Sequence, residues 1–192
     1  AGAGMWDKTI QVLHRLSYVV ASPEKRADVL YRIGETYRLR LGDDERASDA
    51  YLKAIDLDDQ HAPTLRRLID YYWAQGDDAS LLEIGTELDG RGLLAHADTP
   101  ADTLARVAVA AARGGDVARG SGLVRGLGDA AAGALAMALA DAAARAPSAV
   151  DAIAAAARAL CVPPGPSLEA VRAVLAIRAS KDAHSARLVS EL

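Results

Sequence analysis

The stretch from Ala27 to His61, ADVLYRIGETYRLRLGDDERASDAYLKAIDLDDQH, decides the expected fold. Its first half repeats apolar or small residues every three or four positions up to Leu41, a spacing that predicts a helix with one packed face. Gly42 then stops the helix, because glycine is the usual residue just after a helix C-terminus. A second helix is expected over residues 45–57. The stretch therefore predicts two consecutive helices joined by a short turn.

These residues resemble the tetratricopeptide repeat, a helix-turn-helix unit of about 34 residues. In the family's first helix a large residue, Leu, Gly and Tyr recur, and this chain has Leu30, Ile33, Gly34 and Tyr37 at that spacing. The second helix matches through Ala47, Tyr51 and Ala54 once a one-residue insertion is allowed. Gly34 and Ala47 are expected to lie at the crossing, since small residues let two helices approach closely.

The repeat pattern continues after His61. A second unit begins at about Ala62, but Ile69 and Leu81 stand where the small residues are expected. A third unit begins at about Ala101, with the small pair restored as Ala108 and Gly120. We therefore expect repeat units over residues 5–128.

A helix is also expected before the first full unit, from Trp6 to Val20. Trp6, Ile10, Leu13, Leu16 and Val20 form its apolar stripe. It is interpreted as the second helix of a preceding repeat, so we expect the chain to be part of a longer repeat protein and expect self-association through this helix. Residues 1–4, AGAG, are interpreted as a cloning remnant.

Beyond Asp129 the chain is rich in alanine, which favours helix because it loses no side-chain entropy there. Residues 129–192 are expected to continue the stack as further helices, without an assigned repeat register. The expected fold is thus all-α: a right-handed α-solenoid of antiparallel helix pairs, a tetratricopeptide-like superhelix of about ten helices.

Composition and motifs argue against several functional classes. The net charge of −4 disfavours a general nucleic-acid binder, and no long uncharged apolar run predicts membrane insertion. The four histidines lack metal-site spacing, and no phosphate loop or nucleophile elbow is present. Cys161, the single cysteine, is interpreted as a buried structural thiol. We expect no cofactor, no metal, no catalysis and a cytoplasmic location.

The resemblance implies ligand binding in a concave groove lined by the first helix of each unit. The corresponding positions include Tyr31, Arg38, Arg66, Asp70 and Trp73. Trp and Arg are enriched at binding hot spots, and an aromatic ring flanked by guanidinium groups suits an acidic peptide. The family's carboxylate clamp is not expected, because it uses Asn where this chain has Glu35 and Asp70.

The expected function is therefore a non-catalytic scaffold that binds a protein or peptide on this face. Two alternatives stay open at this point. The repeats could assemble with one another without a peptide ligand, or they could be the docking region of an enzyme whose catalytic domain lies elsewhere. A solvated face, in which Glu35 and Asp70 balance the arginines, is the simpler interpretation of the same residues.

Overall fold

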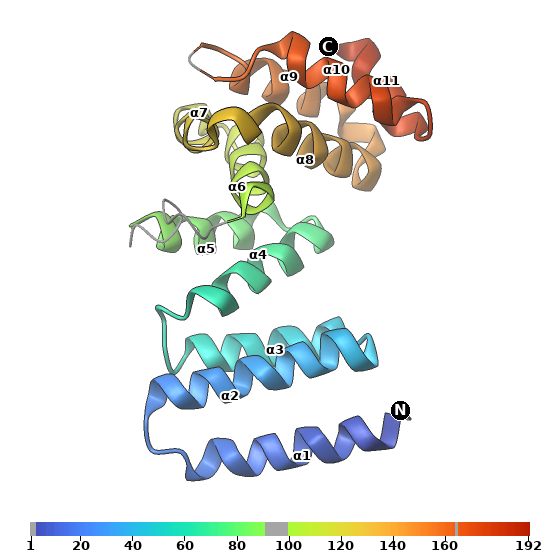
Figure 1. The fold of residues 1–192 in the computed structure, drawn as a ribbon. Helices are drawn as coiled ribbons and strands as arrows, with labels where there is room; N and C mark the ends of the chain where they lie inside the picture. The colour runs from blue at the N-terminus through green and yellow to red at the C-terminus, as the bar shows by residue number, and fades with distance from the viewer. Residues whose placement is uncertain (1–2, 91–99, 164) are drawn as a thin grey trace. The chain divides into compact units, whose positions relative to one another are not determined.

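The computed structural model describes residues 3–90, 100–163 and 165–192, and all regular structure in these ranges is helical (Figure 1). Eleven α-helices lie in the described part of the chain, where about ten were expected. Their bounds are α1 Ala3–Val19, α2 Pro23–Thr36, α3 Asp44–Ile55, α4 Ala62–Gln75, α5 Asp78–Gly90, α6 Ala101–Arg113, α7 Val117–Gly126, α8 Ala131–Arg145, α9 Val150–Leu160, α10 Leu168–Ala179 and α11 Ala183–Glu191.

The helix boundaries follow local capping chemistry. Ser22 precedes Pro23 at the start of α2 and accepts a hydrogen bond from the backbone N–H of Lys25. Asp43 and Asp116 cap α3 and α7 in the same way, through the third residue after each cap. The carboxylates at these positions satisfy free N–H groups and the helix dipole.

The chain divides into two compact units, Ala1–Tyr71 (unit 1) and Tyr72–Leu192 (unit 2), with the division inside α4. Unit 2 includes helices from both sides of residue 129, and the alanine-rich α8 packs against α6.

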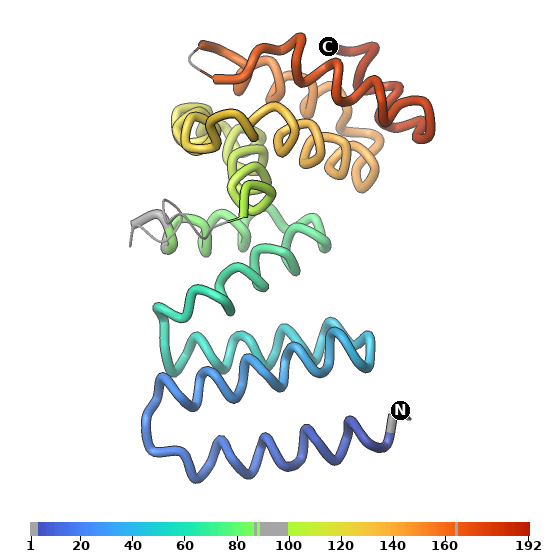
Figure 2. The backbone as a smooth tube through the Cα atoms, viewed as in Figure 1, coloured from blue at the N-terminus to red at the C-terminus, as the bar shows by residue number. Residues whose placement is uncertain are grey.

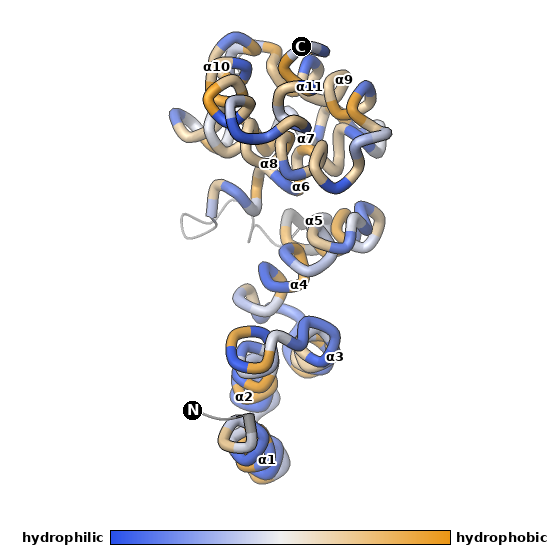
Figure 3. Tube along the Cα trace, turned by 90° about the vertical axis from the view of Figure 1, so that its right-hand side faces the viewer, coloured by the Kyte–Doolittle hydropathy of each residue, from blue (hydrophilic) through white to orange (hydrophobic). Residues whose placement is uncertain are grey.

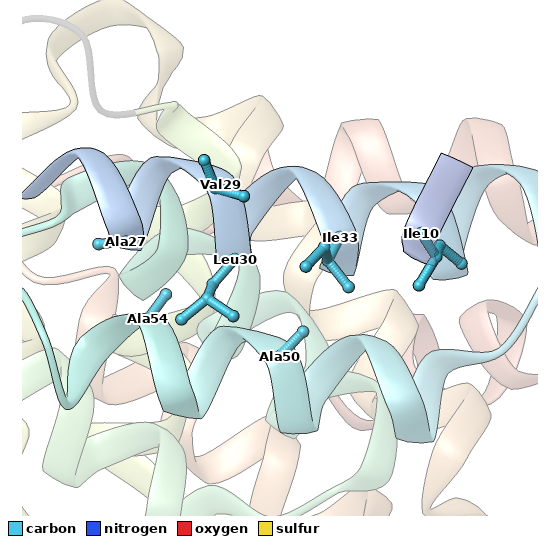
Figure 4. Close-up of a cluster of buried hydrophobic side chains, with 7 residues drawn as sticks. All are labelled: Ile10, Ala27, Val29, Leu30, Ile33, Ala50 and Ala54. Atoms are coloured by element: carbon cyan, nitrogen blue, oxygen red, sulfur yellow. The ribbon is translucent and has the colours of Figure 1, made fainter. Parts of the chain in front are cut away.

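In unit 1, α1, α2 and α3 are packed in chain order, as the backbone trace shows (Figure 2). The core cluster combines Ile10 of α1 with residues of α2 and α3, and Leu30 points from α2 toward Ala50 and Ala54 of α3 (Figure 4). A π-helical turn, Tyr37–Leu41, follows α2 directly and ends at Gly42, whose φ is +66°. This turn carries Arg40 to the ring of Trp6, 4.9 Å from its centroid.

Gly34 lies under the ring of Tyr51. A Cβ atom at Gly34 would stand 2.6 Å from Cδ1 and 2.9 Å from Cζ of Tyr51, too close for any side chain without movement of the ring. Ala47, the expected neighbour of Gly34, is buried at 1% exposure, but the three atoms nearest to that Cβ all belong to Tyr51. The close approach at Gly34 therefore accommodates an aromatic ring four residues further along α3.

In unit 2, α6 packs against α7, α8 and α9, and α8 packs in turn against α10 and α11. Gly120 of α7 lies at the backbone of α6, because a Cβ there would be 2.8 Å from the carbonyl oxygen of Ala108 and 2.8 Å from Cδ2 of Leu160. The structure thus brings the small pair Ala108 and Gly120 together. Cys161 is buried, at 8% exposure, and burial raises the pKa of its thiol to about 11.

The first helix begins at Ala3, so Ala3 and Gly4 belong to regular structure. Its packed face also differs from the expected stripe. Ile10 and Ser17 are its most buried residues, at 4% and 6%, whereas Leu16 is 40% exposed. At this end of α1 the core therefore contains Ser17 instead of the expected Leu16. The buried face is rotated about the helix axis relative to the expected stripe.

Candidate functional site

A polar cluster in unit 1 contains Arg38 and Asp70, two of the five side chains that sequence analysis placed in a groove. Its members are Glu35 of α2, Arg38 of the π-helical turn Tyr37–Leu41, Tyr51 of α3, and Arg67 and Asp70 of α4, and we call it the Glu35 network. Glu35 and Arg38, three residues apart, form one ion pair, and Arg67 and Asp70, also three apart, form another within α4. The network joins three helices through one carboxylate.

Glu35 is the centre of this network. Its carboxylate accepts hydrogen bonds from Nε and Nη2 of Arg38 at 3.1 and 3.0 Å, and from the hydroxyl of Tyr51 at 2.5 Å. Nε of Arg67 reaches it from α4 at 3.0 Å, and Nη1 of Arg67 binds Asp70 at 3.2 Å. Two guanidinium groups and two carboxylates are therefore balanced within one cluster.

The environment keeps Glu35 ionised. Burial alone would raise its pKa, but the hydrogen bonds from Arg38 and Tyr51 and the charge of Arg67 outweigh burial and hold the pKa of Glu35 below its ordinary value. The Tyr51 hydroxyl shows the opposite shift, because burial and the hydrogen bond to Glu35 raise its pKa. Tyr51 consequently donates a proton in this hydrogen bond and Glu35 accepts it.

A second group of contacts links α2 to the start of α4. The ring of Tyr31 lies 5.5 Å from the ring of His61 and 5.9 Å from that of Tyr51, centroid to centroid. His61 is held by Asp28 through Nε2 at 3.0 Å and by Thr64 through Nδ1 at 2.7 Å. α2 and the beginning of α4 are thus connected along their length, at Asp28, Tyr31 and Glu35.

The structure brings together Tyr31, Arg38 and Asp70 in unit 1, three of the five predicted groove residues. Arg66 is half-buried, and the neighbouring Arg67 makes the ion pair with Glu35. The sequence placed Arg66, and not Arg67, at a groove position. Arg67 follows the family's groove position by one residue, and this position did not indicate an ion pair with Glu35 of α2.

Trp73 does not fit the predicted ligand anchor. Its side chain is only 3% exposed, and the guanidinium of Arg145 covers its ring at 4.1 Å from the centroid. Both residues belong to unit 2. The helical periodicity placed Trp73 on a plausible face of α4 but could not show that a residue seventy positions away in the sequence lies over that face. Trp73 is a core residue.

A second cluster, in unit 2, was not found from the sequence. Gly76, Asp78, Arg113, Arg145 and Ala146 line a pocket of roughly 380 Å³. Arg113 forms an ion pair with Asp78 at 2.9 Å, and burial, aided by the nearby cations Arg106 and Arg113, lowers the pKa of Arg145. The sequence indicated this cluster only through Arg113 and Arg145, basic residues in the last turns of α6 and α8.

Helix dipoles account for these charges. Gln75, Arg113 and Arg145 are the last residues of α4, α6 and α8, so three helix C-termini with partial negative charge meet at this pocket. Arginines at such ends are stabilising without a ligand. The pocket therefore needs no bound anion to explain its composition.

Other classes of site are limited within the described residues. No group of three or more His, Cys, Asp or Glu side chains there is placed to hold a metal ion. No single described helix has both the length and the apolar character needed to cross a membrane; α7 and the segment Gly128–Arg145 meet the criteria only together, bent by 117°.

Comparisons with known proteins add no assignment: no protein-family model matches the chain, and no curated protein matches it significantly.

Proposed function

We propose that this chain is a tetratricopeptide-like scaffold, a right-handed solenoid of antiparallel helix pairs, and that it acts by binding a protein or peptide on its concave face. In such a solenoid the first helices of successive units are neighbours and together line the concave side. α2 and α4 are the first helices of two successive expected units. Their direct connection through Glu35 and Arg67 is the observation that carries the proposal.

The π-helical turn supports the same repeat register. The resemblance to the repeat requires one additional residue between Tyr37 and Ala47, and the π-helical turn Tyr37–Leu41 lies within this interval. A π turn accommodates one more residue per turn than an α-helix, which is how a helix absorbs a single insertion. The departure from the repeat length thus has a local structural cause.

The exposed parts of the Glu35 network define the chemistry of the ligand. Arg38 and Arg67 keep about a third of their side chains exposed, and Glu35 occupies only two of the five N–H donors of Arg38. The remaining donors favour carboxylate or carbonyl oxygens of an extended segment. Tyr31 offers an aromatic surface beside them.

The direct test is affinity capture from the native extract with matched variants. The test variant combines Arg38→Gln with Arg67→Gln, the two arginines of the network, and the control combines Lys25→Gln with Lys53→Gln, two exposed lysines outside the network. We expect the control to retain the partners of the wild type and the test variant to lose them, with both variants retaining helical circular dichroism. Recovery of the same partners by the folded test variant would exclude this face as the binding surface.

A further inference from the structure

One face of α1 carries an apolar stripe that the rest of unit 1 does not cover. Four large apolar residues on it are exposed: Met5 at 49%, Val12 at 62%, Leu16 at 40% and Val19 at 77%. With Thr9 they follow spacings of four, three, four and three residues, which place all five on one line along the helix. We call these five residues the α1 stripe.

The spacing of the α1 stripe is that of a coiled-coil seam, in which apolar residues alternate between intervals of three and four. Single exposed apolar residues are ordinary on protein surfaces, but a continuous line of them marks an interaction surface. The stripe lies beside the face that packs on α2 through Ile10, so its long edge adjoins the core of unit 1. It extends over roughly 21 Å, the length of fourteen helical residues.

Both edges of the α1 stripe are positively charged. Lys8 and Arg15, seven residues apart, lie roughly 60–80° round the helix from the centre of the stripe. On the other edge, the guanidinium of Arg40 covers the ring of Trp6. The helix contains one acidic residue, Asp7, which lies roughly 160° from the centre of the stripe, on the opposite side.

The positive charge on both edges determines which kind of partner the α1 stripe can bind. In a pair of α1 helices from two copies, running in opposite directions, Lys8 and Arg15 of one copy would face the same residues of the other, and like charges at these flanking positions oppose pairing. A helix flanked by acidic residues would meet cations on both edges instead. We propose that the α1 stripe binds an amphipathic helix of a partner protein whose apolar seam is flanked by Asp or Glu.

A lipid surface fits the same stripe less well. Helices that lie in a membrane interface present a wide apolar face, whereas the exposed α1 stripe is a narrow seam with the polar Thr9 within it. The proposal does not depend on the Glu35 network, since none of its residues belongs to the α1 stripe. Either surface can therefore fail in its test while the other stands.

Two synthetic helical peptides of about three heptads provide the probe. Both have Leu and Ile at the seam positions, and the flanking positions are all Glu in one peptide and all Lys in the other. Fluorescence anisotropy with the full chain should give a dissociation constant about tenfold or more lower for the Glu peptide, with the difference reduced at high salt.

Charge exchange tests the cause of this preference. The variant Lys8→Glu with Arg15→Glu should reverse it and favour the Lys peptide, and Val12→Glu with Val19→Glu should abolish binding of both. These four residues are exposed, so helical circular dichroism and the denaturation midpoint should be retained. The control Lys25→Glu with Lys53→Glu changes the net charge equally, away from α1, and should keep the preference of the wild type.

Four results would overturn the proposal. The folded wild type could bind neither peptide, or it could bind both equally. Sedimentation could reveal a dimer that the Glu peptide does not dissociate and that Val12→Glu with Val19→Glu abolishes, which would assign the stripe to a second copy. Finally, vesicles of phosphatidylcholine and phosphatidylserine could bind through the same valines while the Glu peptide does not compete, which would assign it to a membrane.

Discussion

In unit 1 a glycine makes room for an aromatic ring, whereas in unit 2 a glycine makes room for the backbone of the neighbouring helix. Gly34 lies under Tyr51, whose hydroxyl then reaches Glu35 at 2.5 Å. Gly120 lies against the carbonyl oxygen of Ala108 and the side chain of Leu160. The same small residue thus serves a polar network in one unit and apolar packing in the other.

Composition follows this difference. α1, α2 and α3 alternate between strongly hydrophilic and strongly hydrophobic residues, whereas α8 and α9 are mostly weakly hydrophobic, as expected for alanine (Figure 3). Buried alanines dominate the packed faces of α6, α8 and α9. Stability in unit 1 should therefore respond to charge and pH, and stability in unit 2 should respond mainly to volume.

The largest effect is expected at Trp73, in unit 2. Because the side chain is buried, Trp73→Ala should lower the free energy of unfolding by about 3–5 kcal/mol, the usual cost of removing a buried aromatic ring. Urea denaturation followed by circular dichroism measures this loss. Tyr18→Ala, which removes a ring that is 81% exposed, is the control and should change stability by less than about 0.5 kcal/mol. Equal midpoints for both variants would mean that Trp73 is a surface residue.

The two close approaches should be distinguishable by substitution. Gly34→Leu and Gly120→Leu should each cost about 1–3 kcal/mol through overpacking. In unit 1, however, the displaced Tyr51 also leaves Glu35, so adding Tyr51→Phe to Gly34→Leu should cost less than Tyr51→Phe alone. Denaturation midpoints of the four combinations give this coupling.

In unit 2, adding Leu160→Ala should reduce part of the destabilisation caused by Gly120→Leu. The shorter side chain removes the contact with Leu160, whereas the contact with the backbone carbonyl of Ala108 remains. In unit 1, the contradicting result would be additive changes in the free energy of unfolding for Gly34→Leu and Tyr51→Phe. Gly34 would then not position the ring of Tyr51, and the two units would not differ in this respect.

The helices were predictable from sequence, and much of the site was not. Periodicity, Ser22-Pro23 and Gly42 fix where helices begin and end, since these are local properties of the chain. The close approach of Gly120 to Ala108 was also expected, because small residues at helical spacing have few other reasons to recur. Trp73 and Arg67 depended on distant partners, Arg145 and Glu35, whose positions no local pattern contains.

Rotation of a helix is equally hard to predict when several of its faces are apolar. α1 has apolar residues on two adjacent lines, one through Ile10 and one through Leu16, and periodicity accepts either as the packed face. The structure packs the line through Ile10 and exposes the other. The exposed line, through Leu16, is the α1 stripe for which a partner helix is proposed.

An effect of pH is expected in unit 1. The pKa of Glu35 is below its ordinary value of 4.5 in the folded chain, so its ionised form contributes stability that is fully present above that value. Glu35→Gln should cost about 1 kcal/mol at pH 7, a typical net value for hydrogen bonds in a half-buried network. The difference from wild type should shrink as pH falls below 4.5 and through the lower folded-state pKa.

Denaturation at pH 7 and at successive values below pH 4.5 measures this dependence. Asp129→Asn, a substitution of an exposed carboxylate in unit 2, serves as the control and should show little change with pH. A constant difference between wild type and Glu35→Gln at every pH would mean that the ionisation of Glu35 does not stabilise the fold.

The smallest expected effect is a gain in stability. It tests whether added side-chain volume destabilises unit 2 only at close contacts such as that of Gly120. Gly133 lies in α8, and a Cβ at this position would meet nothing within 4 Å. Gly133→Ala should therefore raise the free energy of unfolding by about 0.5–1 kcal/mol, because alanine loses less backbone entropy in a helix. Gly115→Ala is the contrasting control: it has open space too, but its φ of +94° disfavours any side chain, so it should destabilise. If Gly133→Ala destabilised as much as Gly120→Ala, the alanine-rich packing would extend across a face of α8 that the structure leaves open, and volume would limit unit 2 everywhere rather than at the crossing of α6 and α7.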